Sequence, residues 1–171
     1  MQYPEFQNIF IDVDRGVSGV GRETLKIAAF AREVPFTKAV DIGTGSGFIA
    51  IYLSSLGKHC EGTDVNPAAL ACATRNAEKN NLRVNFYPSD LFENVDGTFD
   101  LLICNFPVGS AKSSILNTPI EFMKSFLPKG NRVVPLVAFL FIRKHREEMI
   151  TRFLQDAKKV TGKNARAILF L

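Results

Sequence analysis

A glycine-rich loop between an apolar strand pattern and an apolar helix pattern constrains this sequence most. Residues 39–42 are predicted as a strand, the loop is Gly43-Thr44-Gly45-Ser46-Gly47, and Phe48 to Leu56 is predicted as a helix with Leu56 among its inward-facing residues. Glycines at alternate positions let the backbone approach a ligand closely, because no Cβ stands in the way. A plain tight turn is the alternative, but the order strand, loop, helix favours a cofactor-binding loop.

Strand and helix patterns alternate along the rest of the chain. Right-handed crossovers turn such alternation into an α/β fold, an open, doubly wound and mostly parallel sheet with helices on both faces. The predicted helices are Arg22 to Arg32, Pro67 to Asn80, Pro119 to Phe126 and Lys144 to Lys159; the further predicted strands are Cys60 to Val65, Val84 to Tyr87, Phe99 to Cys104, one from about Leu136, and Ala165 to Leu171.

Length and composition indicate one globular domain. A chain of 171 residues with 46% hydrophobic and 22% charged residues can bury a core. We expect a single domain over 1–171, with an N-terminal segment and helix (1–36), a core that carries the site (37–142), and a C-terminal helix and strand (143–171). The longest apolar run, 133–142, is too short to cross a membrane. Cysteines without C-x-x-C spacing and the absence of a leader pattern predict a cytoplasmic location.

Candidate ligand-binding residues follow the predicted strands. Ligands of open α/β sheets bind beyond the carboxyl ends of the strands, where the strand order reverses. Asp64 ends the second strand, 21 residues after Gly43. An acidic side chain at about this distance from a glycine loop accepts hydrogen bonds from a ribose diol in nucleotide-binding α/β folds, although Asp64 could instead be a solvated charge at a helix start. Asp90 could accept from an adenine amine or cap a helix. Phe48 occupies the third glycine position of a dinucleotide fingerprint, which argues against a dinucleotide-dependent oxidoreductase.

Asn105 directly follows the fourth predicted strand and is the candidate catalytic residue. Its side-chain oxygen and the carbonyl of Phe106 could accept the two hydrogens of an amide or an exocyclic amine, although Asn105 could also be a turn residue. His59 and His145 have no acidic or cysteine neighbours at ligand spacing, so we expect no metal site. A basic excess between Arg143 and Arg166 could contact phosphates, or could be a solvated helix face.

Four segments together resemble the class I S-adenosylmethionine-dependent methyltransferases, and more narrowly the HemK-like "small domain" branch that methylates planar nitrogens. Arg22-Glu23-Thr24 is similar to the arginine-proline-glutamate-threonine stretch that precedes the cofactor loop in that branch. The four segments are Val40 to Gly47, Thr63-Asp64-Val65-Asn66, Ser89-Asp90-Leu91-Phe92 and Phe99 to Pro107.

The resemblance implies a Rossmann-like fold, S-adenosyl-L-methionine as the cofactor, and a role for each matching residue. Asp41 with Gly43, Gly45 and Gly47 would hold the methionine end of the cofactor. Asp64 and Val65 would lie at the ribose, and Asp90 and Leu91 at the adenine. Asn105, Phe106 and Pro107 would form the substrate motif, with Asn105 also next to the cofactor.

The activity that the resemblance implies is methyl transfer to a planar nitrogen, foremost a glutamine amide of a protein such as a translation release factor. An exocyclic amine of an RNA or DNA base is the alternative acceptor. Phe106 and Val108 replace the first proline and the closing aromatic of the family's motif, so a non-catalytic cofactor-binding module stays open. We expect a macromolecular substrate, no membrane, and an activating partner subunit as a further option, because the chain lacks the helical substrate domain of the bacterial members. The polar loop 109–118 has the length of a lid.

Overall fold

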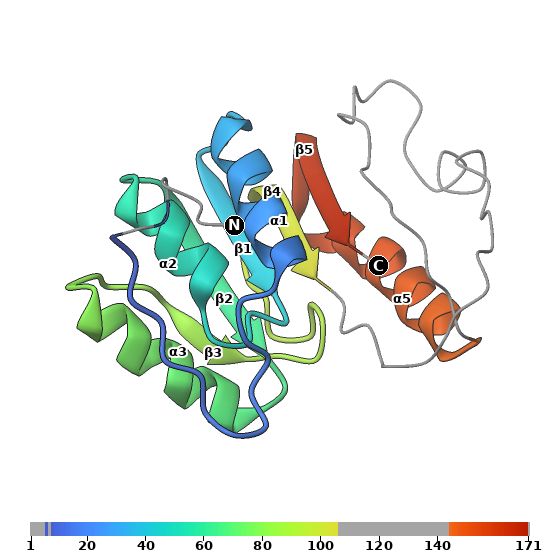
Figure 1. Cartoon of the computed structure of the whole chain (residues 1–171). Helices are drawn as coiled ribbons and strands as arrows, with labels where there is room; N and C mark the ends of the chain where they lie inside the picture. Colours follow the sequence, from blue (N-terminus) through green and yellow to red (C-terminus); the bar gives the residue numbers. More distant parts are fainter. Residues whose placement is uncertain (1–5, 7, 106–143, 171) are drawn as a thin grey trace.

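Parallel strands form one sheet in the order β3-β2-β1-β4-β5 in the computed structural model, which describes residues 6, 8–105 and 144–170 (Figure 1). Every strand pair within these residues is parallel. The chain passes outward from β1 to β2 and β3, and then crosses to the other side of β1 to form β4. This confirms the predicted α/β fold and puts the reversal of strand order between β1 and β4. The strands are β1 (Lys38–Ile42), β2 (His59–Asp64), β3 (Phe86–Pro88), β4 (Phe99–Asn105) and β5 (Thr161–Phe170).

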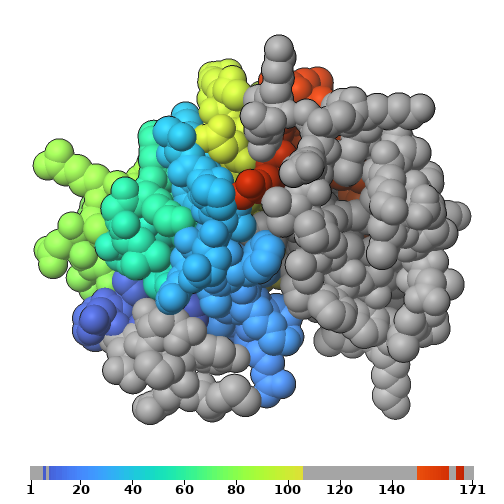
Figure 2. All heavy atoms as spheres, turned by 90° about the horizontal axis from the view of Figure 1, so that it is seen from above, coloured from blue at the N-terminus to red at the C-terminus, as the bar shows by residue number. Residues whose placement is uncertain are grey.

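Helices cover both faces of the sheet because β1 and β4 are apolar on both sides. Ala39 and Ile103 pack against the layer of α1 and α2, whereas Val40 and Leu102 pack with Phe153 of α5 on the opposite face. The atoms of α1, α2 and α3, coloured from blue through teal to green, lie next to one another in Figure 2. The helices are α1 (Arg22–Glu33), α2 (Phe48–Ser55), α3 (Pro67–Lys79) and α5 (Lys144–Val160).

Most predicted boundaries differ from the structure by one residue or not at all, and three differences change how the chain packs or pairs. Leu56, expected to face inward, is 49% exposed, because α2 ends at Ser55 and the chain turns at Gly57, whose φ is +73°. The third strand is Phe86–Pro88 and therefore starts later than Val84. The last strand starts at Thr161 rather than Ala165, because an irregularity between Phe99 and Leu101 of β4 lets additional residues pair before the regular register begins.

Several predictions concern residues outside the described part of the chain. They are the helix from Pro119 to Phe126, the strand from about Leu136, the loop 109–118, the end of the last strand at Leu171, and the motif residues Phe106, Pro107 and Val108. Within the described part, no helix has the length and apolar character needed to cross a membrane.

Candidate functional site

A pocket of about 240 Å³ lies where the strand order reverses, at the carboxyl ends of β1, β2 and β4. Six residues predicted for cofactor binding lie together in its wall, although they come from four separate parts of the sequence. The described lining consists of these six, Gly43, Asp64, Val65, Asp90, Leu91 and Asn105, together with Ser18, Ile42, Ser89 and Cys104.

The glycine loop 43–47 has its backbone donors occupied by the protein itself. Gly43 N and Thr44 N both donate to the carbonyl oxygen of Thr63 at 2.8 Å, and Gly47 N donates to Thr44 O at 2.9 Å. The two remaining N–H groups are bound as well: Gly45 N donates to Asp64 Oδ2 at 3.0 Å, and Ser46 N to Ser18 O at 3.1 Å. A phosphate-binding loop needs N–H groups directed at the ligand, so this loop is not built as a phosphate cradle.

Two loop glycines are required for steric reasons. Gly45 has a φ of +56°, and a Cβ there would lie 2.8 Å from Ser18 O. Gly47 has a φ of +83°, and its Cβ would lie 2.7 Å from Ala73 Cβ. An L side chain would therefore meet both backbone strain and a clash at either position. Gly43 differs, because a Cβ there would meet nothing within 4 Å, and it lines the pocket.

Asp41 lies beneath the loop rather than in the pocket wall. It is 1% exposed, and its Oδ2 accepts a hydrogen bond from Thr44 Oγ1 at 2.7 Å. The pKa of Asp41 is raised from 3.8 to about 7, mainly by burial; the hydrogen bond from Thr44 opposes this rise, and the nearby charge of Asp64 adds to it. A positive charge nearby would stabilise the ionised form of this buried carboxyl.

Asp64 and Asp90 are the two carboxylates of the pocket. The two oxygens of half-buried Asp64 accept from Asn66 N at 2.9 Å and from Gly45 N at 3.0 Å. Each carboxylate oxygen can accept more than one hydrogen bond, so these contacts orient Asp64 without exhausting it. Asp90 is exposed and accepts from Arg152 of α5 at 2.7 Å, which ties the loop after β3 to the opposite helix layer.

The backbone at Leu91 is held in an uncommon conformation. Leu91 has a φ of +51° and is 8% exposed. The buried hydroxyl of Ser89 donates to Leu91 O at 2.9 Å and accepts from Asn94 N at 3.0 Å. These bonds compensate for the strain of a left-handed leucine and present its side chain at the pocket wall. Val65, 66% exposed, lies at the rim.

Asn105 ends β4 at the pocket, where its side chain meets α1. Its Nδ2 donates to Thr24 Oγ1 at 3.1 Å, across 81 residues of sequence. With Nδ2 bound to Thr24, the carbonyl branch of the amide is left for a ligand. Phe106 and Pro107, the other two predicted residues of the motif, lie outside the described residues, so their roles stay predictions.

Sequence reasoning missed Asn76 of α3, which supports the loop from behind. Asn76 is 1% exposed, and its Nδ2 donates to Ser46 O and to Asp12 O, both at 2.9 Å. Its Oδ1 accepts from Asp12 N, also at 2.9 Å. Asn76 thereby joins the N-terminal segment to the glycine loop. The only sequence signal is that this asparagine lies on the alanine-rich face of the helix. That position indicates that Asn76 is buried but not which groups it hydrogen-bonds. Ser18 and Arg152 were missed as well, and Ser89 was part of a recognised segment but was given no role.

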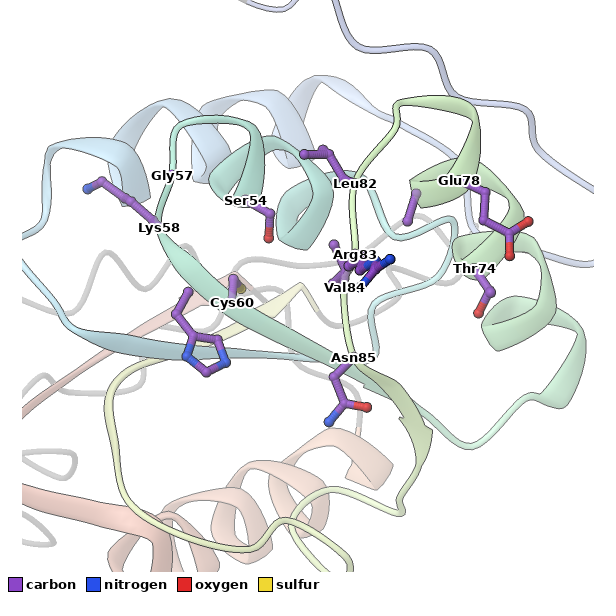
Figure 3. A pocket seen from close by; sticks show the side chains of 12 residues that line it. Ser54, Gly57, Lys58, Cys60, Thr74, Glu78, Leu82, Arg83, Val84 and Asn85 are labelled. Carbon is purple, nitrogen blue, oxygen red and sulfur yellow. The ribbon is translucent and has the colours of Figure 1, made fainter.

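A larger hollow of about 750 Å³ lies at the amino end of β2, between α3 and the segment 82–85 (Figure 3). The side chains of Lys58 and Arg83 point in opposite directions there. Lys58 Nζ donates to the carbonyls of Arg32 and Val34 at 2.5 and 3.3 Å, so it serves the end of α1. Burial raises the pKa of the Cys60 thiol, which disfavours a reactive thiolate. This hollow does not assemble catalytic groups.

The chemistry of the smaller pocket is selective. Its described lining has two carboxylates and no lysine, arginine or histidine. Such a wall suits a ligand with hydroxyl or amine donors and a positive charge, and opposes a pyrophosphate. No group of three or more His, Cys, Asp or Glu side chains in the described ranges is arranged to hold a metal ion.

Comparison with known proteins adds a family and several relatives. Residues 23–168 match the methyltransferase small domain family. The chain is 34% identical over 132 residues to a ribosomal protein L11 methyltransferase of Thermosipho africanus, covering 74% of this chain and 49% of that protein. It is 42% identical over 80 residues to a release factor glutamine methyltransferase of Geobacter sulfurreducens, covering 44% of this chain and 28% of that protein.

A solved structure shares the fold over nearly the whole chain. It is the precorrin 8W decarboxylase of Methanobacterium thermoautotrophicum, with a TM-score of 0.59, 14% identity, and coverage of 93% of this chain and 68% of the other. At this identity the likeness concerns the fold alone. The chain spans less than half the length of the two methyltransferases above.

Proposed function

The chain belongs to the methyltransferase small domain family, and we propose that it binds S-adenosyl-L-methionine and transfers a methyl group to a planar nitrogen, the side-chain amide of a glutamine in a translation release factor. The family match extends over residues 23–168, which include every described residue of the pocket except Ser18. The proposal therefore concerns the carboxyl-end pocket and not the larger hollow at the other end of β2.

The observation that supports this proposal most is the donor and charge balance of the pocket. All five N–H groups of the loop 43–47 are bound within the protein, and the described lining carries two carboxylates and no cation of its own, although Asp90 is paired with Arg152 from outside the lining. Asp64 would hold the ribose hydroxyls, Asp90 and Leu91 would lie at the adenine, and Gly43 would leave room for the methionine end. Above about pH 7, where Asp41 beneath the loop is ionised, its negative charge favours the positively charged ligand.

Methyl transfer needs alignment more than a dedicated nucleophile. The cofactor, when bound, supplies a methyl group on a positively charged sulfur that is already a good leaving group. The chain must then hold the accepting nitrogen in line with that methyl group and keep hydrogen bonds to its hydrogens, one of which must leave as a proton to solvent when the new N–C bond forms and the S–C bond breaks. Alignment of this kind can contribute up to about 7 to 11 kcal/mol to lowering the barrier. Asn105 is suited to aligning the substrate because its amide oxygen can accept a hydrogen bond from an N–H group of the substrate amide.

The glutamine acceptor is the finer part of the proposal. It is supported by the release factor glutamine methyltransferase of Geobacter sulfurreducens and by the position of Asn105 at the end of β4. The L11 methyltransferase relative makes a ribosomal protein the first competing protein substrate. A nucleic acid base is the competing acceptor from another class of macromolecule.

Cofactor binding is tested by calorimetry with S-adenosylmethionine. Asp64→Asn should weaken binding roughly 10- to 100-fold, since a hydrogen bond to a charged group contributes about 1.5 to 3 kcal/mol. Asp96→Asn, an equal change of charge at an exposed position, is the matched control and should bind like the wild type. Equal affinity of all three proteins would contradict the assignment of Asp64.

Acceptor choice is tested with cofactor carrying a labelled methyl group. Purified release factor, ribosomal protein L11 and total tRNA are offered separately, and the modified residue is found by mass spectrometry. We expect label on a glutamine of the release factor, and transfer that is strongly slowed but still measurable in single turnovers with Asn105→Ala. Label on L11 or tRNA alone would refute the glutamine acceptor. Cofactor binding with no transfer to any acceptor would favour a non-catalytic module.

A further inference from the structure

Asn105 has a partner in α1, Thr24, which lies in the Arg22-Glu23-Thr24 stretch but has so far been given no role. Its Nδ2 donates to Thr24 Oγ1 at 3.1 Å, and Thr24 is 9% exposed. The same hydroxyl oxygen accepts from Gly21 N at 3.3 Å, at the amino end of α1. Because two N–H donors point at this oxygen, both of its lone pairs are occupied. Thr24 is thereby held as an acceptor towards Asn105.

This arrangement decides which end of the Asn105 amide faces the pocket. A primary amide has a donor branch and an acceptor branch, and the two point away from each other. With the donor branch bound to Thr24, the acceptor branch of the amide remains available to a ligand in the pocket that Asn105 lines. An amide or amine substrate offers N–H donors, so an inward acceptor is the productive orientation, and the reversed amide would meet the substrate with a second donor.

Thr24 is also a rigid support. It belongs to the first turn of α1, and the next turns of this helix are anchored by Ile27, Ala28 and Ala31, of which none is more than 3% exposed. Asn105 closes a strand whose partners are β1 on one side and β5 on the other. Neither backbone can shift readily, so the hydrogen bond fixes one rotamer of Asn105.

We propose that Thr24 is a positioning residue, which holds the Asn105 amide with its oxygen towards the accepting nitrogen. This inference rests on the proposed function, because it assigns a role towards the substrate amide. Thr24 acts through Asn105 and need not touch the substrate or the cofactor.

The test compares Thr24→Val, which removes the acceptor at nearly constant shape, with Thr24→Ser, which keeps it. We expect Thr24→Val to lower kcat for release factor methylation about 10- to 100-fold, with the Kd for S-adenosylmethionine within about twofold of the wild type. Thr24→Ser should restore kcat to within about threefold. Thr74→Val is the matched control, because Thr74 is a helical threonine on the exposed side of α3 whose hydroxyl serves only Leu70 O. It should leave kcat unchanged.

A double-mutant cycle separates positioning from a general structural effect. In an Asn105→Ala background, measured under single-turnover conditions, Thr24→Val should cause no further loss, because its partner is already missing. An equal loss in both backgrounds would overturn the proposal, as would a Thr24→Ser variant as slow as Thr24→Val.

A spectroscopic measurement on the cofactor-free protein tests the hydrogen bond itself. The side-chain amide signals of Asn105 are identified in a ¹⁵N-labelled sample by their loss in Asn105→Asp. They should shift, and their protons should exchange faster with water, in Thr24→Val but not in Thr74→Val. An unchanged Asn105 signal in Thr24→Val would refute the positioning role, whereas a wild-type chain that methylates no release factor would refute the glutamine acceptor instead.

Discussion

Replacing Asp41 with asparagine should stabilise the cofactor-free protein, although it removes a predicted cofactor-binding residue. Asp41 is buried beneath the glycine loop, where desolvation raises its pKa from 3.8 to about 7. At a pH above both pKa values the carboxyl is charged in the folded and in the unfolded protein. The charge is buried only in the folded state, so the free energy of desolvating it destabilises that state. The amide introduced by Asp41→Asn keeps an acceptor for Thr44 Oγ1 without the charge.

The size of this effect follows from linkage. Between pH 4 and pH 7 the folded protein retains a proton that the unfolded chain has lost, so the contribution of Asp41 to stability falls as pH rises. The difference between the two pKa values corresponds to at most about 4 kcal/mol at pH 8. The gain in the free energy of unfolding of Asp41→Asn over the wild type should therefore be near zero at about pH 4 and largest above about pH 7.

Urea unfolding of wild type and Asp41→Asn at several pH values, without cofactor, measures this difference. Asp96→Asn controls for an equal change in net charge at an exposed position. A pH-independent difference between wild type and Asp41→Asn, or an Asp41→Asn protein less stable than wild type at pH 8, would refute the reasoning. Added S-adenosylmethionine should raise the melting temperature of the wild type more than that of Asp41→Asn, because only the wild type offers the charge.

Three further changes test the framework of the site. Gly47→Ala should cost about 1 to 3 kcal/mol in urea unfolding, because it combines a φ of +83° with a Cβ 2.7 Å from that of Ala73; Gly57→Ala, with positive φ but open space, should cost less. Thr63→Val should raise the melting temperature, since the buried Thr63 hydroxyl has no hydrogen-bond partner among the described residues and its removal could gain about 1 to 2 kcal/mol. Phe153→Ala should lower the free energy of unfolding by about 3 to 5 kcal/mol, because this fully buried ring joins α5 to the sheet.

The strands of the sheet and the end of α2 show which features could be predicted from the sequence and which could not. The apolar runs around Val40 and Leu102 predicted strands of a sheet with helices on both faces, and both strands pack against helices there. The predicted end of α2 is one residue too late, because the apolar periodicity continues through Leu56 and gives no sign that the chain turns there. Six of the predicted cofactor residues lie in one pocket, since the carboxyl ends of parallel strands share one edge of the sheet.

Among the described residues, local sequence was sufficient to specify the order of strands and helices, the glycine loop and the chemical types at the strand ends, because these depend on periodicity and backbone conformation. The packed fold was needed to establish that Thr24 holds Asn105, that Asn76 braces the loop, and that Arg152 pairs with Asp90. These partners lie 81, 30 and 62 residues apart, and no local pattern specifies which distant side chain will complete a hydrogen bond. Such contacts exist only once the helices have packed on the sheet. The sequence shows which chemical groups are present, but only the packed structure shows which partners orient them.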